Sequence, residues 1–109
     1  MNIAIILAGG TGTRLGGDVP KQYIEVSGKP IISYCLDKFE RHNQIDNIVI
    51  VASEMWQNYI MSWIKKDNLK KFSGFAPAGS SRQHSIVNGL IKAKSIGAVA
   101  DDNIIIHDA

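Results

Sequence analysis

The chain has 109 residues, of which 45% are hydrophobic and 20% are charged. This length allows one domain at most, and this composition is typical of an ordinary soluble globular protein. The net charge of +2 is too small to indicate binding to nucleic acid or to an anionic membrane, and the single cysteine excludes an internal disulfide.

The first predicted element is a strand over residues 2–8, a continuous apolar run that is typical of a strand covered on both faces. A helix is predicted over residues 31–42, with Pro30 at its start, where a missing N–H costs nothing. Cys35 lies on the apolar stripe of this helix, so we expect a packed side chain rather than a reactive thiol.

A second buried strand is predicted over residues 47–52, and a helix over 54–66 follows it with Ser53 as its N-cap. Trp56 and Trp63 are seven residues apart on one face of that helix, which favours packing in the core over stacking on a base.

The last three predicted elements are a strand over residues 72–76, a helix over 82–95 and a strand over 103–106. We expect Ile86, Leu90 and Ala93 to face the core from this helix, and Gly97 to end it. Strands that alternate with helices indicate an α/β fold with a mostly parallel sheet and helices on both faces.

Ligands of such sheets bind beyond the carboxyl ends of the strands. Three segments are predicted to meet there, namely residues 9–17, residues 79–85 and the pair at 107–108. For Arg82 a phosphate contact and a structural role stay open, whereas His107 follows a buried strand and is interpreted as structural.

The segment after the first strand combines glycines with two cations, Arg14 and Lys21. Glycines let backbone N–H groups turn inward around phosphate oxygens, and the cations neutralise further charge, so the pattern suits a triphosphate. It lacks the third glycine of the dinucleotide fingerprint and the Gly-Lys-Ser/Thr of a Walker A loop. The alternative to a phosphate-binding loop is a tight strand-to-helix turn, but such a turn needs neither cation.

Five motifs together carry a resemblance to a known family. They are residues 7–15 (Leu-Ala-Gly-Gly-Thr-Gly-Thr-Arg-Leu), 20–23 (Pro-Lys-Gln-Tyr), 28–30 (Gly-Lys-Pro), 79–90 (Gly-Ser-Ser-Arg-Gln-His-Ser-Ile-Val-Asn-Gly-Leu) and 107–109 (His-Asp-Ala). The combination resembles the cytidylyltransferases that act on 2-C-methyl-D-erythritol 4-phosphate and on ribitol 5-phosphate. The likeness extends from residue 3 to the last residue.

The resemblance implies a Rossmann-like three-layer sandwich of the nucleotide-diphospho-sugar transferase type. It also implies transfer of CMP from CTP to a polyol phosphate with release of pyrophosphate, a reaction that needs alignment and charge neutralisation. In the catalytic pair, Arg14 would bind the β- and γ-phosphates and Lys21 the α-phosphate.

The same resemblance implies which other residues meet the nucleotide. Asp108 would help to hold Mg²⁺. The nucleotide-binding positions would be Ala8, Gly9, Gly10 and Gly12 by their backbone, Gly79, Ser80 and Ser85 at the cytosine and ribose, and Ala109 at the ribose.

Two segments depart from the family pattern. Ala78, Gly79 and Ser80 stand where the family usually has two glycines and an acidic residue, and a serine oxygen is a weaker acceptor than a carboxylate. Gly9 stands where the methylerythritol enzymes more often have alanine.

The acceptor stays open between two polyol phosphates. Gly9 and Trp56 favour ribitol 5-phosphate, which serves cell-wall (teichoic acid) precursors. Gln22, Tyr23 and the His-Asp-Ala ending favour 2-C-methyl-D-erythritol 4-phosphate, an isoprenoid precursor that we rank first.

The chain ends shortly after the fourth predicted strand. We therefore expect residues 1–109 to be the N-terminal nucleotide-binding portion of one longer cytidylyltransferase domain, cytoplasmic and homodimeric when complete. A nucleotide-binding module without catalysis is the main alternative. A nicotinamide-binding Rossmann domain is disfavoured because no acidic residue directly ends the second strand.

Overall fold

The computed structural model describes residues 1–9 and 19–109. Its centre is a sheet of four parallel strands in the order β5-β4-β1-β6. The strands are β1 (Asn2–Leu7), β4 (Asn47–Ala52), β5 (Phe72–Pro77) and β6 (Asn103–Asp108). In β1 and β4 every residue after the first is buried, because these central strands are covered on both faces.

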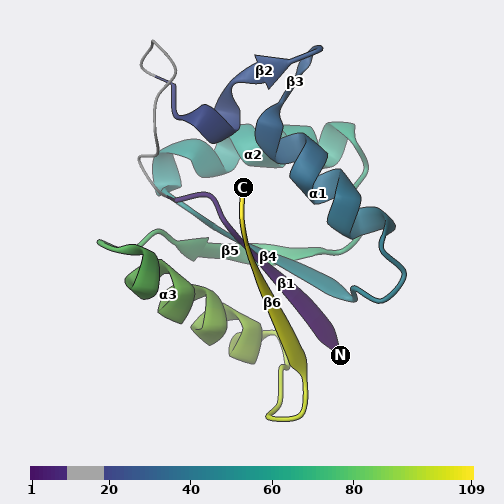
Figure 1. Ribbon diagram of the computed structural model, residues 1–109, viewed down its shortest axis with the longest axis vertical. Coiled ribbons are helices and arrows are strands. Elements are labelled where there is room, and N and C mark those ends of the chain that lie inside the picture. Colours follow the sequence, from purple (N-terminus) through teal and green to yellow (C-terminus); the bar gives the residue numbers. More distant parts are fainter. Residues whose placement is uncertain (10–18) are drawn as a thin grey trace.

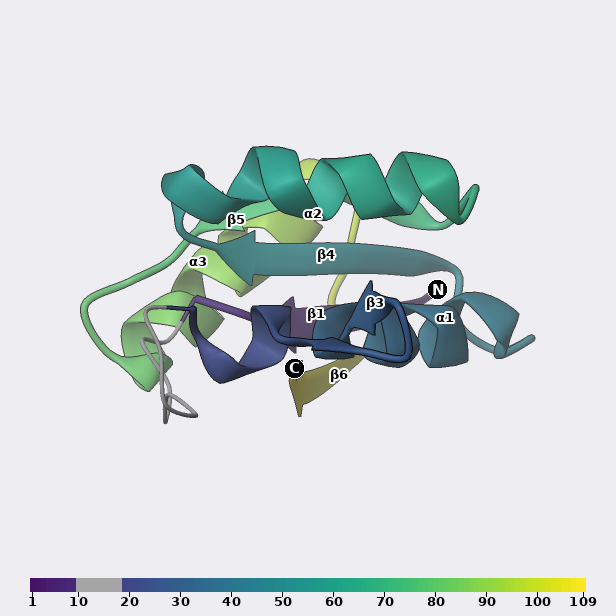
Figure 2. The same ribbon diagram turned by 90° about the horizontal axis from the view of Figure 1, so that it is seen from above.

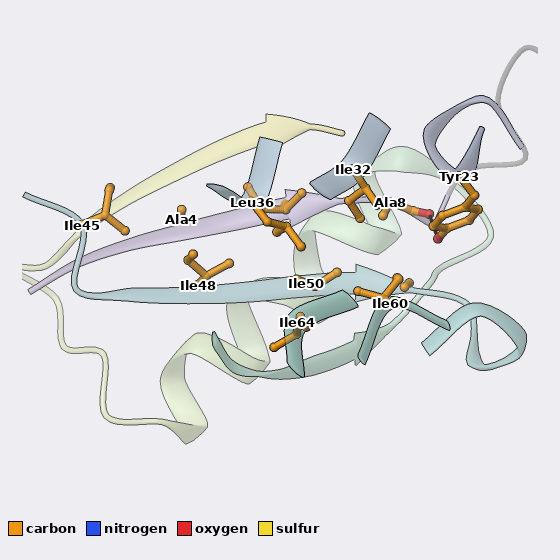
Figure 3. Packing of buried hydrophobic residues seen from close by; sticks show 12 residues of the cluster. Ala4, Ala8, Tyr23, Ile32, Leu36, Ile45, Ile48, Ile50, Ile60 and Ile64 are labelled. Carbon is orange, nitrogen blue, oxygen red and sulfur yellow. Dashed lines mark hydrogen bonds between the residues drawn. The ribbon is translucent and has the colours of Figure 1, made fainter. Parts of the chain in front are cut away.

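Three helices complete the layers. The helices α1 (Ile31–Arg41) and α2 (Glu54–Lys66) cover one face of the sheet, and α3 (Arg82–Ser95) covers the other (Figure 1, Figure 2). Even-numbered residues of β1 and β4 pack with α1 and α2 in one core cluster (Figure 3), and odd-numbered residues pack toward α3 in a second cluster. The predicted Rossmann-like three-layer sandwich is confirmed.

Local signals place the ends of the helices where the sequence predicts them. Pro30 precedes α1, Ser53 occupies the N-cap position of α2, and Gly97 has a φ of 111° just after the end of α3. The side chain of Ser53 makes no capping hydrogen bond, and its carbonyl oxygen accepts from the Trp56 N–H instead. The strand predicted over residues 72–76 is confirmed as β5.

One prediction about α3 is wrong, because Leu90 does not face the core. Leu90 is 41% exposed, and its neighbour Gly89 takes the buried position between Ser85 and Ala93. A Cβ atom at Gly89 would lie 2.7 Å from Cγ2 of Ile5. The helix therefore packs so closely on the sheet that only glycine fits there, and this rotates Leu90 outward.

A short hairpin between β1 and α1 was not predicted. It follows a 3-10 helix, η1 (Lys21–Tyr23), and consists of two antiparallel strands, β2 (Glu25–Val26) and β3 (Lys29–Pro30). Both residues of its turn have positive φ, 53° at Ser27 and 86° at Gly28, as tight hairpin turns require.

Strand β6 forms one edge of the sheet and has no strand on its outer side in the part of the chain that the structure describes. Ile105 and Ile106 of β6 are exposed, as are Val87, Leu90 and Ile91 of α3. An exposed edge strand and an exposed apolar helix face are surfaces that other chain segments can cover. None of the helices within residues 1–9 and 19–109 has the length and hydropathy to span a membrane.

Candidate nucleotide site

The carboxyl ends of β1, β5 and β6 surround one cavity of about 400 Å³. This is the position where open parallel sheets bind ligands. The lining residues come from three separated segments, and they are Leu7, Gly9, Gln22, Gly79, Ser80, Ser81, Arg82, Ser85, Asp108 and Ala109. Six of the predicted site residues are therefore brought together, namely Gly9, Gly79, Ser80, Ser85, Asp108 and Ala109.

The first wall is the end of β1. Hydrogen bonds to the carbonyl oxygen of Ala8 fix its position. This oxygen accepts hydrogen bonds from Nε2 of Gln22 and from Oη of Tyr23, each over 2.9 Å. Figure 3 shows the Tyr23 ring beside Ala8. The ring also stacks on Trp56 with 4.2 Å between centroids, so Trp56 packs in the core as predicted. Ala8 thus shapes this wall from just behind the cavity lining.

Burial raises the pKa of Tyr23 to about 12. The phenol therefore keeps its proton at ordinary pH and remains a donor to Ala8. Gln22 lines the cavity although sequence reasoning gave it no site role. The only signal for it was its place in the motif of residues 20–23.

Of the two predicted catalytic cations, only Lys21 lies within the described residues. Lys21 is the first residue of η1, next to Gln22, and it is exposed rather than part of the cavity lining. Gly10, Gly12 and Arg14 lie outside the described residues. Their predicted roles stay predictions.

The second wall is the turn from β5 into α3. The Gly79 N–H donates to Oγ of Ser85 over 2.9 Å, and the Ser80 N–H donates to Nδ1 of His84 over 3.1 Å. Ser81 caps α3, since its Oγ accepts from the His84 N–H. His84 is exposed, and its ring and backbone tie this wall to the first turn of α3.

The third wall is the end of β6. The Ala109 N–H donates to the carbonyl oxygen of Leu7, which continues the pairing of β6 with β1. Arg82 donates a bidentate pair of hydrogen bonds to the Asp108 carboxylate, with 3.3 Å from Nε to Oδ1 and 3.1 Å from Nη2 to Oδ2. Both side chains are more than half exposed, so this ion pair adds little stability and can be exchanged for a ligand.

Asp108 is the residue predicted to hold Mg²⁺. Within residues 1–9 and 19–109, no three His, Cys, Asp or Glu side chains gather as a metal site would require. Mg²⁺ is commonly held by one or two carboxylates together with substrate phosphates. A single carboxylate at the rim of the cavity fits a magnesium ion that arrives with a triphosphate.

Cys35 of α1 and His107 of β6 are not part of the cavity lining. Sγ of Cys35 lies 3.6 Å from Nδ1 of His107, and the His107 ring meets Phe39 edge-on. Burial raises the pKa of the Cys35 thiol to about 11, which keeps it protonated and unreactive. Both residues pack α1 against β6, in agreement with the structural roles that the sequence predicts.

Comparisons with known proteins agree with the geometry. The family model described as IspD: 2-C-methyl-D-erythritol 4-phosphate cytidylyltransferase matches residues 2–109. A ribitol-5-phosphate cytidylyltransferase of Lacticaseibacillus paracasei is 41% identical over 99% of this chain and 46% of its own length. A 2-C-methyl-D-erythritol 4-phosphate cytidylyltransferase of Clostridium acetobutylicum is 43% identical over 99% and 45%.

Two solved structures are similar in fold. The crystal structure of a 4-diphosphocytidyl-2C-methyl-D-erythritol synthase matches with a TM-score of 0.75 and 29% identity, covering 98% of this chain and 44% of that one. HddC from Yersinia pseudotuberculosis, complexed with GMP-PN, matches with a TM-score of 0.64 and 32% identity over 90% and 44%. The chain thus spans less than half the length of the relatives it matches.

Proposed function

Because the chain belongs to the IspD, 2-C-methyl-D-erythritol 4-phosphate cytidylyltransferase, family, we propose that it forms the nucleotide-binding part of a CTP-dependent cytidylyltransferase. The observation that carries this proposal is the cavity at the carboxyl edge of the sheet. Three segments that are far apart in the sequence converge on it, and each contributes a motif of the family.

In the proposed reaction a phosphate oxygen of the acceptor attacks the α-phosphorus of CTP. One P–O bond forms, the bond between the α-phosphorus and the bridging oxygen breaks, and pyrophosphate leaves with that oxygen. The protein supplies alignment and neutralisation of phosphate charge. We assign Lys21 to the α-phosphate and Arg14 to the β- and γ-phosphates.

The two later walls are assigned to the nucleoside and the metal. Gly79, Ser80 and Ser85 would meet the cytosine and the ribose, and the backbone of Ala109 would approach the ribose. Asp108 would hold Mg²⁺ once Arg82 releases it, and the ion would add positive charge against the triphosphate. The exposed ion pair with Arg82 supports an Asp108 carboxylate that is open to exchange.

For the acceptor we propose 2-C-methyl-D-erythritol 4-phosphate, with ribitol 5-phosphate as the second candidate. Relatives named for each acceptor are similar to this chain at nearly the same identity, 43% and 41%. The complete enzyme is proposed to act in the cytoplasm and as a homodimer.

The test is calorimetric titration of the protein with CTP, UTP, ATP and NAD, each with Mg²⁺. Selective binding of CTP is the expected result, and selective binding of NAD would overturn the proposal. Pyrophosphate release is then measured with each polyol phosphate as acceptor. CTP binding without release under either acceptor would favour the non-catalytic alternative.

A further inference from the structure

His84 occupies the first turn of α3, where it contacts the cavity wall through its ring. Nδ1 accepts the Ser80 N–H over 3.1 Å and also lies 3.3 Å from Oγ of Ser80. In return, the His84 N–H donates to Oγ of Ser81, the N-cap residue. The arrangement is similar to a capping box, except that the side chain reaches one residue beyond the cap, into the wall itself.

The ring of His84 also explains why residue 79 is glycine. A Cβ atom built on Gly79 would lie 2.4 Å from Cγ of His84 and 2.7 Å from its backbone carbon. Contacts this short do not occur between real atoms, so no side chain fits between the wall and the helix. The imidazole is therefore packed directly against the backbone of Gly79.

The N–H groups of Gly79 and Ser80 are both bonded to side chains of α3. The side chains of Ser85 and His84 therefore fix the backbone conformation of this wall. Because Nδ1 accepts a backbone hydrogen, the neutral ring carries its proton on Nε2. Nδ1 has one in-plane lone pair, so the Ser80 hydroxyl competes for it with the Ser80 backbone N–H, which cannot rotate away.

We propose that His84 is a positioning residue for the base of the bound nucleotide, an inference that rests on the proposed function. Its Nδ1 fixes the Gly79–Ser80 wall, and by holding the Ser80 N–H it leaves the Ser80 hydroxyl available to the base. The His84 ring thereby supports a wall in which Ser80 stands where the family usually has a carboxylate.

The test compares two substitutions of similar size. His84→Asn places Oδ1 where Nδ1 stands and keeps the acceptor, whereas His84→Leu removes it. Loss of one net hydrogen bond predicts that His84→Leu raises the Kd for CTP about tenfold, and that His84→Asn changes it less than about threefold. Hydrogen exchange at the Ser80 amide should speed up in His84→Leu alone.

His42 offers a matched control. Its Nδ1 accepts the Gln44 N–H over 3.2 Å just after α1, far along the chain from the cavity wall. His42→Leu removes the same kind of bond and should leave the Kd for CTP unchanged. Ring ¹⁵N shifts of the unsubstituted protein add a readout that needs no variant, since they report whether Nδ1 is unprotonated.

The possible results separate the two proposals. Failure of the unsubstituted protein to bind CTP would overturn the proposed function and, with it, this role of His84. CTP binding that His84→Leu and His84→Asn weaken equally, or not at all, would overturn the role of His84 alone. A proton on Nδ1 at neutral pH would also overturn it, even if His84→Leu failed to fold.

Discussion

Tyr23 donates its phenolic hydrogen to the carbonyl oxygen of Ala8 over 2.9 Å, and this bond ties η1 to the end of β1. Nε2 of Gln22 donates to the same oxygen. Lys21 begins η1, so its backbone is fixed relative to the cavity although its side chain is exposed. The two buried donors thereby fix the backbone next to the cavity-lining Gln22, while the charge of Lys21 stays in solvent.

The shared acceptor predicts that substitutions at these two positions are not additive. Tyr23→Phe leaves Ala8 bonded to Gln22 and should cost about 1 kcal/mol in the free energy of unfolding. Adding Gln22→Met leaves a buried carbonyl without either donor, which should cost about 1–3 kcal/mol more than the two single losses predict. Urea unfolding of the parent, both single variants and the double variant measures this coupling. Simple additivity would show that the two bonds are independent.

The raised pKa of Tyr23 predicts a loss of stability at alkaline pH. Burial raises the pKa from 10.0 to about 12 in the folded chain, so folding favours the protonated phenol. This contribution is fully present below pH 10 and is lost as the pH rises from 10 to 12. Urea midpoints between pH 9 and 12 should fall less steeply in Tyr23→Phe than in the parent. Equal slopes in Tyr23→Phe and the parent would show that another group carries the alkaline loss of stability.

Lys21→Ala tests the role assigned to the exposed lysine. If its ammonium meets charge that develops on the α-phosphate, the turnover number of the active enzyme should fall by about 10²–10³. The Kd for CTP should change much less, because the contact strengthens in the transition state. Lys65→Ala removes an exposed lysine from the last turn of α2 and should have no effect. Normal turnover in Lys21→Ala would remove Lys21 from the mechanism.

Local sequence signals were enough to predict the sheet and the three long helices. Continuous apolar runs identify β1 and β4 as buried strands, and Gly97 marks the end of α3 because its positive φ suits a residue without Cβ. Ser53 stands at the N-cap position of α2 although its side chain makes no capping bond. The hairpin after η1 was missed because its strands are only two residues long and carry no periodicity. Short elements of this kind depend on the contacts that surround them.

What the sequence could not show was which side chains meet across the fold. Leu90 was placed inward by its spacing, but the closeness of α3 to Ile5 is a tertiary property that only Gly89 accommodates. The roles of Gln22 and His84 depend in the same way on the nearness of Ala8 and Ser80. The family motifs located the cavity, and the structure adds the residues that hold its walls in place.

The contact between Gly9 and Ala78 predicts a compensating pair of substitutions. A Cβ atom on Gly9 would lie 2.4 Å from Cβ of Ala78, so only one methyl group fits between the first and second walls. The methylerythritol enzymes that the chain resembles more often have alanine at the first position, and the family usually has glycine at the second, which is the reverse of this chain. We therefore expect Gly9→Ala to destabilise the protein by about 1–3 kcal/mol through overpacking.

Ala78→Gly should cancel most of that loss when it is combined with Gly9→Ala, because the methyl group then moves from one wall to the other. Ala78→Gly alone should be mildly destabilising, since it opens a methyl-sized gap and adds a flexible glycine. Thermal unfolding of the four proteins measures the coupling, and CTP titration shows whether the rebuilt double variant keeps its site. A double variant whose loss of stability equals the sum of the two single losses would contradict the shared space. It would show that the two walls move apart to accept the added methyl group.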